Sequence, residues 1–99
     1  IHCGLVGSEM CIRDRHGLVH YIFHPDTWET TDVCYLQDLF TLKEMRQQGI
    51  ATALIQAVYE AADINGTPSV YWMTQEFNQK ARKLYDQVAS ITPFIIYQR

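Results

Sequence analysis

The stretch Arg46–Ala51 constrains the fold of this chain more than any other, because it joins two segments of different periodicity. An apolar, β-prone segment, Cys34–Leu42, precedes it, and an amphipathic segment, Ile50–Ile64, follows it. The pattern predicts a strand, a turn at Gly49 and a helix. The first turn of a helix has N–H groups without partners at the positive end of its dipole. We therefore expect this turn to bind an anion such as a phosphate.

Two common phosphate loops are excluded at this turn. No Gly-Lys-Ser/Thr follows, as a Walker A loop requires, and the second and third glycines of the dinucleotide fingerprint are absent. Gly49 would let the backbone approach an anion closely, and Arg46 would add a positive charge. The spacing alone also fits a plain turn with a solvated arginine.

A second strand and helix follow in the C-terminal half of the chain. Val70–Thr74 predicts a short buried strand, and Gln79–Val88 predicts a helix. Asn78 precedes this helix, where asparagine is a preferred cap, and Tyr85 lies two turns later. Helical spacing predicts that this helix buries four side chains, those of Ala81, Leu84, Tyr85 and Val88.

The remaining segments complete a mixed α/β arrangement. Gly17–His24 alternates as a strand should, and Pro25–Asp32 reads as a loop, so an antiparallel hairpin with Cys34–Thr41 is expected. The first helix should stop near Gly66, in the left-handed conformation, and Phe94–Tyr97 should form a last strand. The order predicts a mixed sheet with helices packed on its faces.

Composition narrows the class of protein. The chain has 99 residues and a formal net charge of −3, which fits one domain without the basic patch of a nucleic-acid binder. No apolar run reaches the roughly 20 residues that a membrane helix needs. Cys3, Cys11 and Cys34 show no Cys-x-x-Cys spacing, so we expect reduced thiols in a cytoplasmic protein, with Cys34 in the core.

Three segments together resemble the GCN5-related N-acetyltransferases, the GNAT family. The turn matches the family signature Arg/Gln-x-x-Gly-x-Gly/Ala at Arg46, Gly49 and Ala51. The run from Tyr35 to Phe40 is similar to the family's central strand, and the strand–Asn–helix–Tyr order around Asn78 resembles its other acyl-CoA-binding segment. The amino-acid sequences of these segments most resemble the diamine and polyamine branch, which includes histone acetyltransferase-like proteins. The matches run from about Gly17 to the end.

The resemblance implies an acyl-CoA N-acyltransferase-like fold, acetyl-CoA as co-substrate and transfer of an acetyl group to a primary amine, either of a small molecule or of a protein. By resemblance, the backbone N–H groups of Leu39, Phe40 and Thr41 would hold the cofactor arm and polarise its carbonyl. Asn78 and Tyr85 would also contact the arm. The pyrophosphate would lie beside Arg46 on the amides of Gln47, Gln48, Gly49, Ile50, Ala51 and Thr52.

Two residues are the catalytic candidates. Tyr85 would protonate the departing thiolate, although its spacing also fits simple packing in the core. For the base, the polyamine branch usually has a Glu-Asp pair, and here the pair is Gln37-Asp38. Gln37 cannot take a proton. Asp38 remains the candidate, but adjacent strand residues are expected to face opposite sides, so a structural carboxylate or a water relay stays open.

Three histidines invite a metal interpretation that we reject. His16, His20 and His24 recur every fourth residue, on one face of the predicted strand. At about 3.3 Å per residue they stand far apart, and no carboxylate or cysteine completes the spacing of a metal site. They are expected to line a substrate site or to be solvated.

The N-terminal segment does not fit the family. Residues 1–15 have little periodicity and resemble translated sequencing-adapter read-through, or else a genuine, poorly patterned first strand. We expect residues 16–99 to be the C-terminal part of an acetyltransferase domain. The alternative function is a truncated, non-catalytic fragment or a CoA-binding module that depends on a partner, and an open sheet edge leaves a homodimer open.

Overall fold

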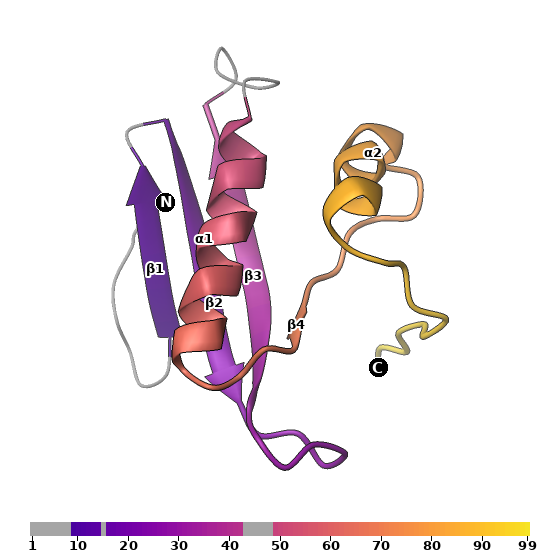
Figure 1. The fold of residues 1–99 in the computed structure, drawn as a ribbon. Coiled ribbons are helices and arrows are strands. Elements are labelled where there is room, and N and C mark those ends of the chain that lie inside the picture. Colours follow the sequence, from indigo (N-terminus) through magenta and orange to yellow (C-terminus); the bar gives the residue numbers. More distant parts are fainter. Residues whose placement is uncertain (1–8, 15, 43–48) are drawn as a thin grey trace.

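The computed structural model describes residues 9–14, 16–42 and 49–99. Within these residues, four strands form one sheet in the order β1-β2-β3-β4, and two helices accompany it (Figure 1). The strands are β1 (Glu9–Asp14), β2 (Gly17–His24), β3 (Val33–Thr41) and β4 (Val70–Tyr71). The helices are α1 (Ile50–Ile64) and α2 (Gln79–Val88). The mixed α/β fold class is therefore confirmed, and both helices have the predicted bounds.

The first three strands are antiparallel and the fourth is parallel to its neighbour. β2 pairs with β3 from Gly17↔Thr41 to His24↔Val33, which confirms the predicted hairpin. β1 pairs with β2 along its whole length, from Glu9↔Ile22 to Asp14↔Gly17. Residues 9–14 of the N-terminal segment thus form a strand. α1 connects β3 to β4, since parallel neighbours need such a crossover.

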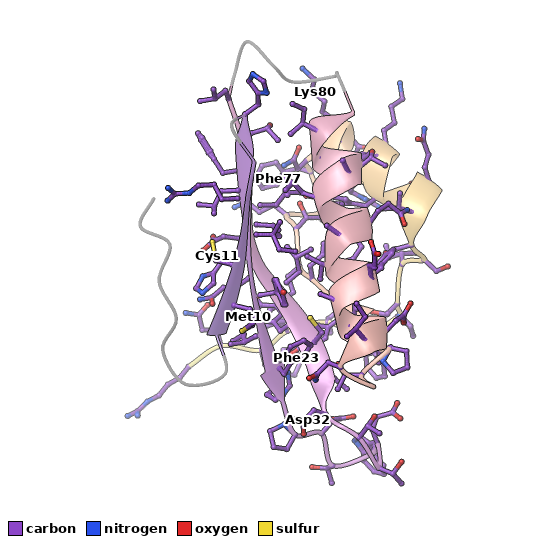
Figure 2. All side chains as sticks on the ribbon, turned by 60° about the vertical axis from the view of Figure 1, so that its left-hand side comes forward. Met10, Cys11, Phe23, Asp32, Phe77 and Lys80 are labelled. Carbon is purple, nitrogen blue, oxygen red and sulfur yellow. The ribbon has the colours of Figure 1, made fainter. Side chains whose placement is uncertain are left out.

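The core lies between one face of the sheet and α1 (Figure 2). Alternate strand positions face the helix, and the apolar side of the amphipathic helix α1 faces the sheet, so the two sets interdigitate. The buried members are Val19, Tyr21, Cys34 and Leu36 from the sheet, and Leu54, Ile55, Val58 and Ala62 from α1. Gly66 follows α1 with φ of 74°, as expected for its stop.

A bulge in β3 overturns the expected geometry of the Gln37-Asp38 pair. His20 pairs with Asp38 but Tyr21 pairs with Leu36, so Gln37 is an extra residue in the strand. Leu36 and Leu39 both pack towards the core, whereas Gln37 and Asp38 are both exposed. The two polar side chains therefore share the face away from α1. The expectation that they face opposite sides was wrong, because the bulge interrupts the alternation.

Three expectations about the C-terminal half were also wrong. The strand predicted at 70–74 is only the two residues of β4, and α2 has half-buried rather than fully buried side chains. Phe94–Tyr97 forms no strand, and its side chains are 67–91% exposed. Periodicity shows which side chains favour burial, but a partner surface must be present, and no described element covers this segment.

The cysteines differ from expectation at one position. Cys34 is a free thiol in the core, as predicted. Cys11, which projects from the sheet on the side away from α1 (Figure 2), is disulfide-bonded, so the prediction of three reduced thiols was wrong. Sequence spacing could not reveal this, because pairing depends on the approach of two Cα atoms in the fold. The argument from reduced thiols to a cytoplasmic location therefore no longer holds.

Neither α1 nor α2, the helices that the structure describes, has the length and apolar character needed to cross a membrane.

Candidate functional site

The sheet opens into a fork between β3 and β4. Pairing of these strands consists of Cys34↔Val70 and Tyr35↔Tyr71 only. Beyond Tyr35, β3 continues to Thr41, while the chain after β4 turns away towards α2 (Figure 1). In the described part of the chain, the edge of β3 from Leu36 to Thr41 therefore has no strand partner.

The direction of the β3 amides determines what this edge offers. The N–H of Leu42 donates to the carbonyl of His16 over 2.9 Å, and therefore points towards β2. Because successive N–H groups along a strand point to opposite edges, those of Thr41 and Leu39 point into the fork. The N–H of Phe40 points towards β2 instead. Of the three expected cofactor donors, Leu39 and Thr41 therefore direct their N–H groups into the fork, and Phe40 does not.

The N-terminus of α1 lies beside the mouth of this fork. A Cβ on Gly17 would come within 2.8 Å of the Phe40 carbonyl and within 3.1 Å of Ile50 Cγ2. The absence of a side chain at Gly17 thus lets the first turn of α1 approach the end of β2 closely, next to the Phe40 carbonyl of β3. The unpaired strand edge and the helix N-terminus belong to one region.

This N-terminus has the properties that an anion requires. Gly49 adopts φ of 79°, no side chain caps the first turn, and that turn contains no acidic residue. The amides of Ile50, Ala51 and Thr52 therefore have no side-chain acceptor. Among the described residues, a Cβ at Gly49 would meet no atom within 4 Å. The other predicted anion ligands, Arg46, Gln47 and Gln48, lie outside the described residues.

A groove of about 540 Å³ lies between β4, α2 and the C-terminal segment. Three segments line it: residues 70–74 of β4 and its continuation, one side of α2, and residues 89–96. Tyr85 lines the groove from α2, and its ring packs edge-on against Trp72 with centroids 5.4 Å apart. Burial raises the pKa of the Tyr85 phenol, so its hydroxyl keeps its proton at neutral pH.

Polar and aromatic contacts attach α2 to the rest of the molecule. The side-chain oxygen of Asn78 accepts a hydrogen bond from the Ala81 N–H over 3.3 Å, which confirms the predicted cap. The Tyr59 hydroxyl of α1 donates to the Val88 carbonyl over 2.9 Å. Trp72 lies between Tyr59 and Tyr85 and contacts both rings. These contacts fix the helix that carries Tyr85.

The structure does not bring the two catalytic candidates together. Asp38 is exposed on the bulge and is not among the residues that line the groove with Tyr85. The groove instead contains Tyr71, which the sequence interpretation missed. Its hydroxyl lies 2.8 Å from Nε2 of His24. The only available signal was the tyrosine within the short second strand, and its pairing could not be read from spacing.

The described residues of the chain contain no group of three or more His, Cys, Asp or Glu side chains placed to hold a metal ion.

Comparison with known proteins gives three consistent results. Residues 10–89 match the sequence profile of the Acetyltransferase (GNAT) family. The chain is 40% identical over 86 residues to the D-amino-acid N-acetyltransferase HPA3 of Saccharomyces cerevisiae, covering 87% of this chain and 53% of that protein. It is 34% identical over 70 residues to the thialysine N-epsilon-acetyltransferase of Mus musculus, covering 71% and 39%.

Solved structures share the fold. The aminoglycoside N-acetyltransferase AAC(6')-Iy in complex with CoA superposes with a TM-score of 0.81 at 20% identity, covering 95% of this chain and 77% of that one. The ribosomal-protein-alanine N-acetyltransferase of Brucella melitensis biovar Abortus 2308 gives 0.79 at 20% identity, covering 93% and 70%. The chain spans about half the length of the yeast relative.

Proposed function

Because the chain belongs to the acetyltransferase (GNAT) family, we propose that it is an acetyl-CoA-dependent N-acetyltransferase that transfers an acetyl group to a primary amine. The observation that carries the proposal is the fork itself. The unpaired edge of β3 and the uncapped N-terminus of α1 support a cofactor site there, and Tyr85 on α2 supplies a phenol that stays protonated.

The fork suits the two ends of an acyl-CoA. The pyrophosphate is placed on the first-turn amides of α1, where two or more N–H groups and the helix dipole favour an anion. The acyl arm runs along β3, and the N–H groups of Leu39 and Thr41 hold it. An N–H directed at the thioester oxygen stabilises the negative charge that develops there, typically by about 10²–10³ in rate.

The chemistry requires one bond to form and one to break. The amine nitrogen attacks the thioester carbon, and the carbon–sulfur bond then breaks to release a thiolate. Tyr85 donates its proton to this thiolate as it leaves. Asn78 holds the first turn of α2 and so contributes to the position of the Tyr85 hydroxyl.

The acceptor we propose is a small primary amine. Two carboxylates, those of Glu76 and Asp86, line the groove together with Arg82. The carboxylates would attract a cationic amine, and the arginine would suit an acceptor that also carries a carboxylate. D-Amino acids and thialysine, which are named for two relatives, are the first acceptors to test.

The first prediction tests the cofactor site. Gly49→Glu should abolish acetyl-CoA binding in isothermal calorimetry, because a negative side chain would occupy the space in front of the first turn. Gly66→Glu is the matched control. It introduces the same side chain at a similar φ of 74°, at the opposite end of α1, and also meets no atom within 4 Å.

The two variants separate strain from charge. Each should lose stability by about 1–2 kcal/mol, the cost of a left-handed residue with a side chain. Only Gly49→Glu should lose binding. Equal acetyl-CoA affinity in both variants would refute the assignment of the α1 N-terminus. Binding without acetylation of any tested amine would support a CoA-binding module instead of an enzyme.

A further inference from the structure

Among the described residues, a single hydrogen bond joins α2 to another helix or strand. The Tyr59 hydroxyl of α1 donates to the carbonyl oxygen of Val88 over 2.9 Å. The last four carbonyls of a helix have no donor within that helix, and Val88 is the last residue of α2. Tyr59 therefore supplies the end of α2 with a donor that the helix itself lacks.

α2 depends on such contacts because its own packing is shallow. It lies beyond β4, at the outer edge of the molecule (Figure 1), and none of its side chains is fully buried. Tyr85 and Val88 pack against the core, but both stay partly exposed. α1, in contrast, buries four side chains against the sheet. α1 is thus the firmly held helix, and its contacts with α2 restrain the weaker one.

The bond from Tyr59 belongs to a closed circuit of contacts around the proposed acid, Tyr85. The rings of Tyr59 and Trp72 lie with centroids 6.3 Å apart, and the Trp72 ring meets the Tyr85 ring edge-on at 5.4 Å. Tyr85 and Val88 are three residues apart in α2 and so lie on the same side of that helix. The circuit therefore begins and ends at Tyr59. It restrains the last turn of α2 at its backbone and at its aromatic ring.

The Tyr59 hydroxyl is suited to keep this bond. A carbonyl oxygen can only accept, so the phenol must donate and must hold its proton. Burial raises the pKa of the Tyr59 phenol. The hydrogen bond to Val88 is therefore maintained at neutral pH.

α1 also carries the proposed site for the pyrophosphate of the cofactor. The amides of that site end at Thr52, and Tyr59 follows two turns later, about 11 Å along the axis at 5.4 Å per turn. Both points belong to one continuous helix. The place that holds the cofactor and the place that restrains the acid thus share one rigid element.

We propose that Tyr59 is a positioning residue of the acetyl-transfer reaction, which acts through Val88 and Trp72 to hold the Tyr85 hydroxyl beside the departing thiolate. The proposal rests on the proposed function, in which Tyr85 gives its proton to the sulfur. Tyr59 does not line the groove that Tyr85 lines, so its effect must pass through these neighbours. A proton donor must lie within hydrogen-bonding reach of its acceptor, so a small displacement of Tyr85 would slow the reaction.

The activity test begins with Tyr59→Phe, which keeps the ring beside Trp72 and removes only the hydroxyl. The kcat for a D-amino acid or thialysine should fall about tenfold, because a displacement of about 1 Å can cost up to 10²-fold. The KM for the amine and the Kd for acetyl-CoA should stay at their wild-type values. A wild-type rate of the acetyl-transfer step in Tyr59→Phe would overturn the proposal.

Tyr35→Phe is the matched control. The Tyr35 ring also stacks on another aromatic ring, that of Tyr71, but its hydroxyl makes no hydrogen bond to another described residue. Tyr35→Phe should therefore retain the wild-type kcat. An equal fall of kcat in both variants would mean that the loss of any partly buried hydroxyl slows the enzyme, and would overturn the role of Tyr59.

The double variant Tyr59→Phe/Tyr85→Phe separates positioning from a general loss of packing. If Tyr59 acts through the Tyr85 hydroxyl, its own hydroxyl should have no further effect on kcat once Tyr85→Phe is present. Effects that multiply would show that the two residues act independently and would overturn the proposal. Urea denaturation measures the stability of each variant, and rates are compared under conditions in which every variant is folded.

Proton NMR of the Tyr85 ring tests the same contact without turnover. The edge-on Trp72 ring should displace the Tyr85 ring signals in the wild type, and Tyr85→Phe assigns them by their loss. In Tyr59→Phe these signals should move towards the shifts of an exposed tyrosine, and in Tyr35→Phe they should not. Unchanged Tyr85 signals in Tyr59→Phe would overturn the positioning role.

The outcomes distinguish this proposal from the proposed function. If the wild-type protein acetylates no tested amine, the proposed function fails and the role of Tyr59 fails with it. If the wild type is active and Tyr85→Phe lowers kcat but Tyr59→Phe does not, the role of Tyr59 alone fails. If Tyr85→Phe keeps the wild-type kcat, the protein is still an acetyltransferase, but Tyr59 has no acid to position.

Discussion

At the scale of single residues, the site depends on hydroxyls whose surroundings keep them protonated. Tyr85 is half-buried against Trp72, and burial raises the pKa of its phenol. A proton donor that remains loaded at neutral pH is ready for a thiolate, although a higher pKa also makes it a weaker acid. Positioning must therefore supply what acidity does not.

The second prediction concerns this hydroxyl. Tyr85→Phe keeps the ring contact with Trp72 and should lower kcat by about 10–10³-fold with the acetyl-CoA Kd unchanged. Stability should change little, since no hydrogen bond between the phenol and another described residue would be lost. Stopped-flow measurement of the acetyl-transfer step provides the rate. If that step runs at the wild-type rate, Tyr85 is only a packing residue.

Residue chemistry could be predicted from the sequence better than residue orientation. The Asn78 cap and the left-handed Gly66 were correct because each depends on local backbone geometry. The orientation of Asp38 was wrong, because a single extra residue in β3 reverses every side chain beyond it. Nothing in the letters Gln37-Asp38 marks a bulge.

At the scale of elements, both helices could be predicted to the residue and the short strand could not. Caps and a 3.6-residue period specify α1 and α2 locally. β4 ends after two residues, and the next side chain, Trp72, contacts the rings of Tyr59 and Tyr85. These contacts join elements that lie far apart in the sequence, so a local pattern could not predict them. The same reason applies to the unpaired segment at 94–97.

The third prediction concerns the cap of α2. Asn78→Ala removes the acceptor for the Ala81 N–H and should destabilise the protein by about 1 kcal/mol, whereas Asn78→Asp keeps an acceptor and should not. Urea denaturation measures both. Hydrogen exchange of the α2 amides should accelerate in Asn78→Ala only. Equal destabilisation by the two substitutions would contradict a role as cap.

At the scale of the whole molecule, one buried thiol links stability to alkaline pH. Burial raises the pKa of Cys34 from 9.0 to about 11. Between these values the unfolded chain loses the proton that the folded chain keeps. The folded state then binds more protons, and stability must fall as pH rises. Below pH 9 the Cys34 thiol is protonated in both the folded and the unfolded state, so its contribution to the free energy of unfolding is then fully present.

The fourth prediction follows from this linkage. The wild-type protein should lose on the order of 3 kcal/mol of unfolding free energy through Cys34 between pH 9 and pH 11. Cys34→Ala should be less stable at neutral pH because it leaves a cavity in the core, but it should lose less on going to pH 11. Urea titrations at pH 7, 9 and 11 measure this difference. Parallel losses in both proteins would exclude Cys34 as the cause.

The length of the two-residue ladder between β3 and β4 also determines how much of the β3 edge stays unpaired. If one more residue after Tyr71 paired with β3, the unpaired part of the β3 edge would become shorter by about 3.3 Å, the rise of one strand residue. The stopping point of the ladder therefore sets the depth to which any thin chain can slide along β3. The Trp72 ring, which contacts Tyr59 and Tyr85, follows directly after that stopping point. Changing the size of this one side chain should rescale the longest acyl tail that fits, without altering any atom that reacts.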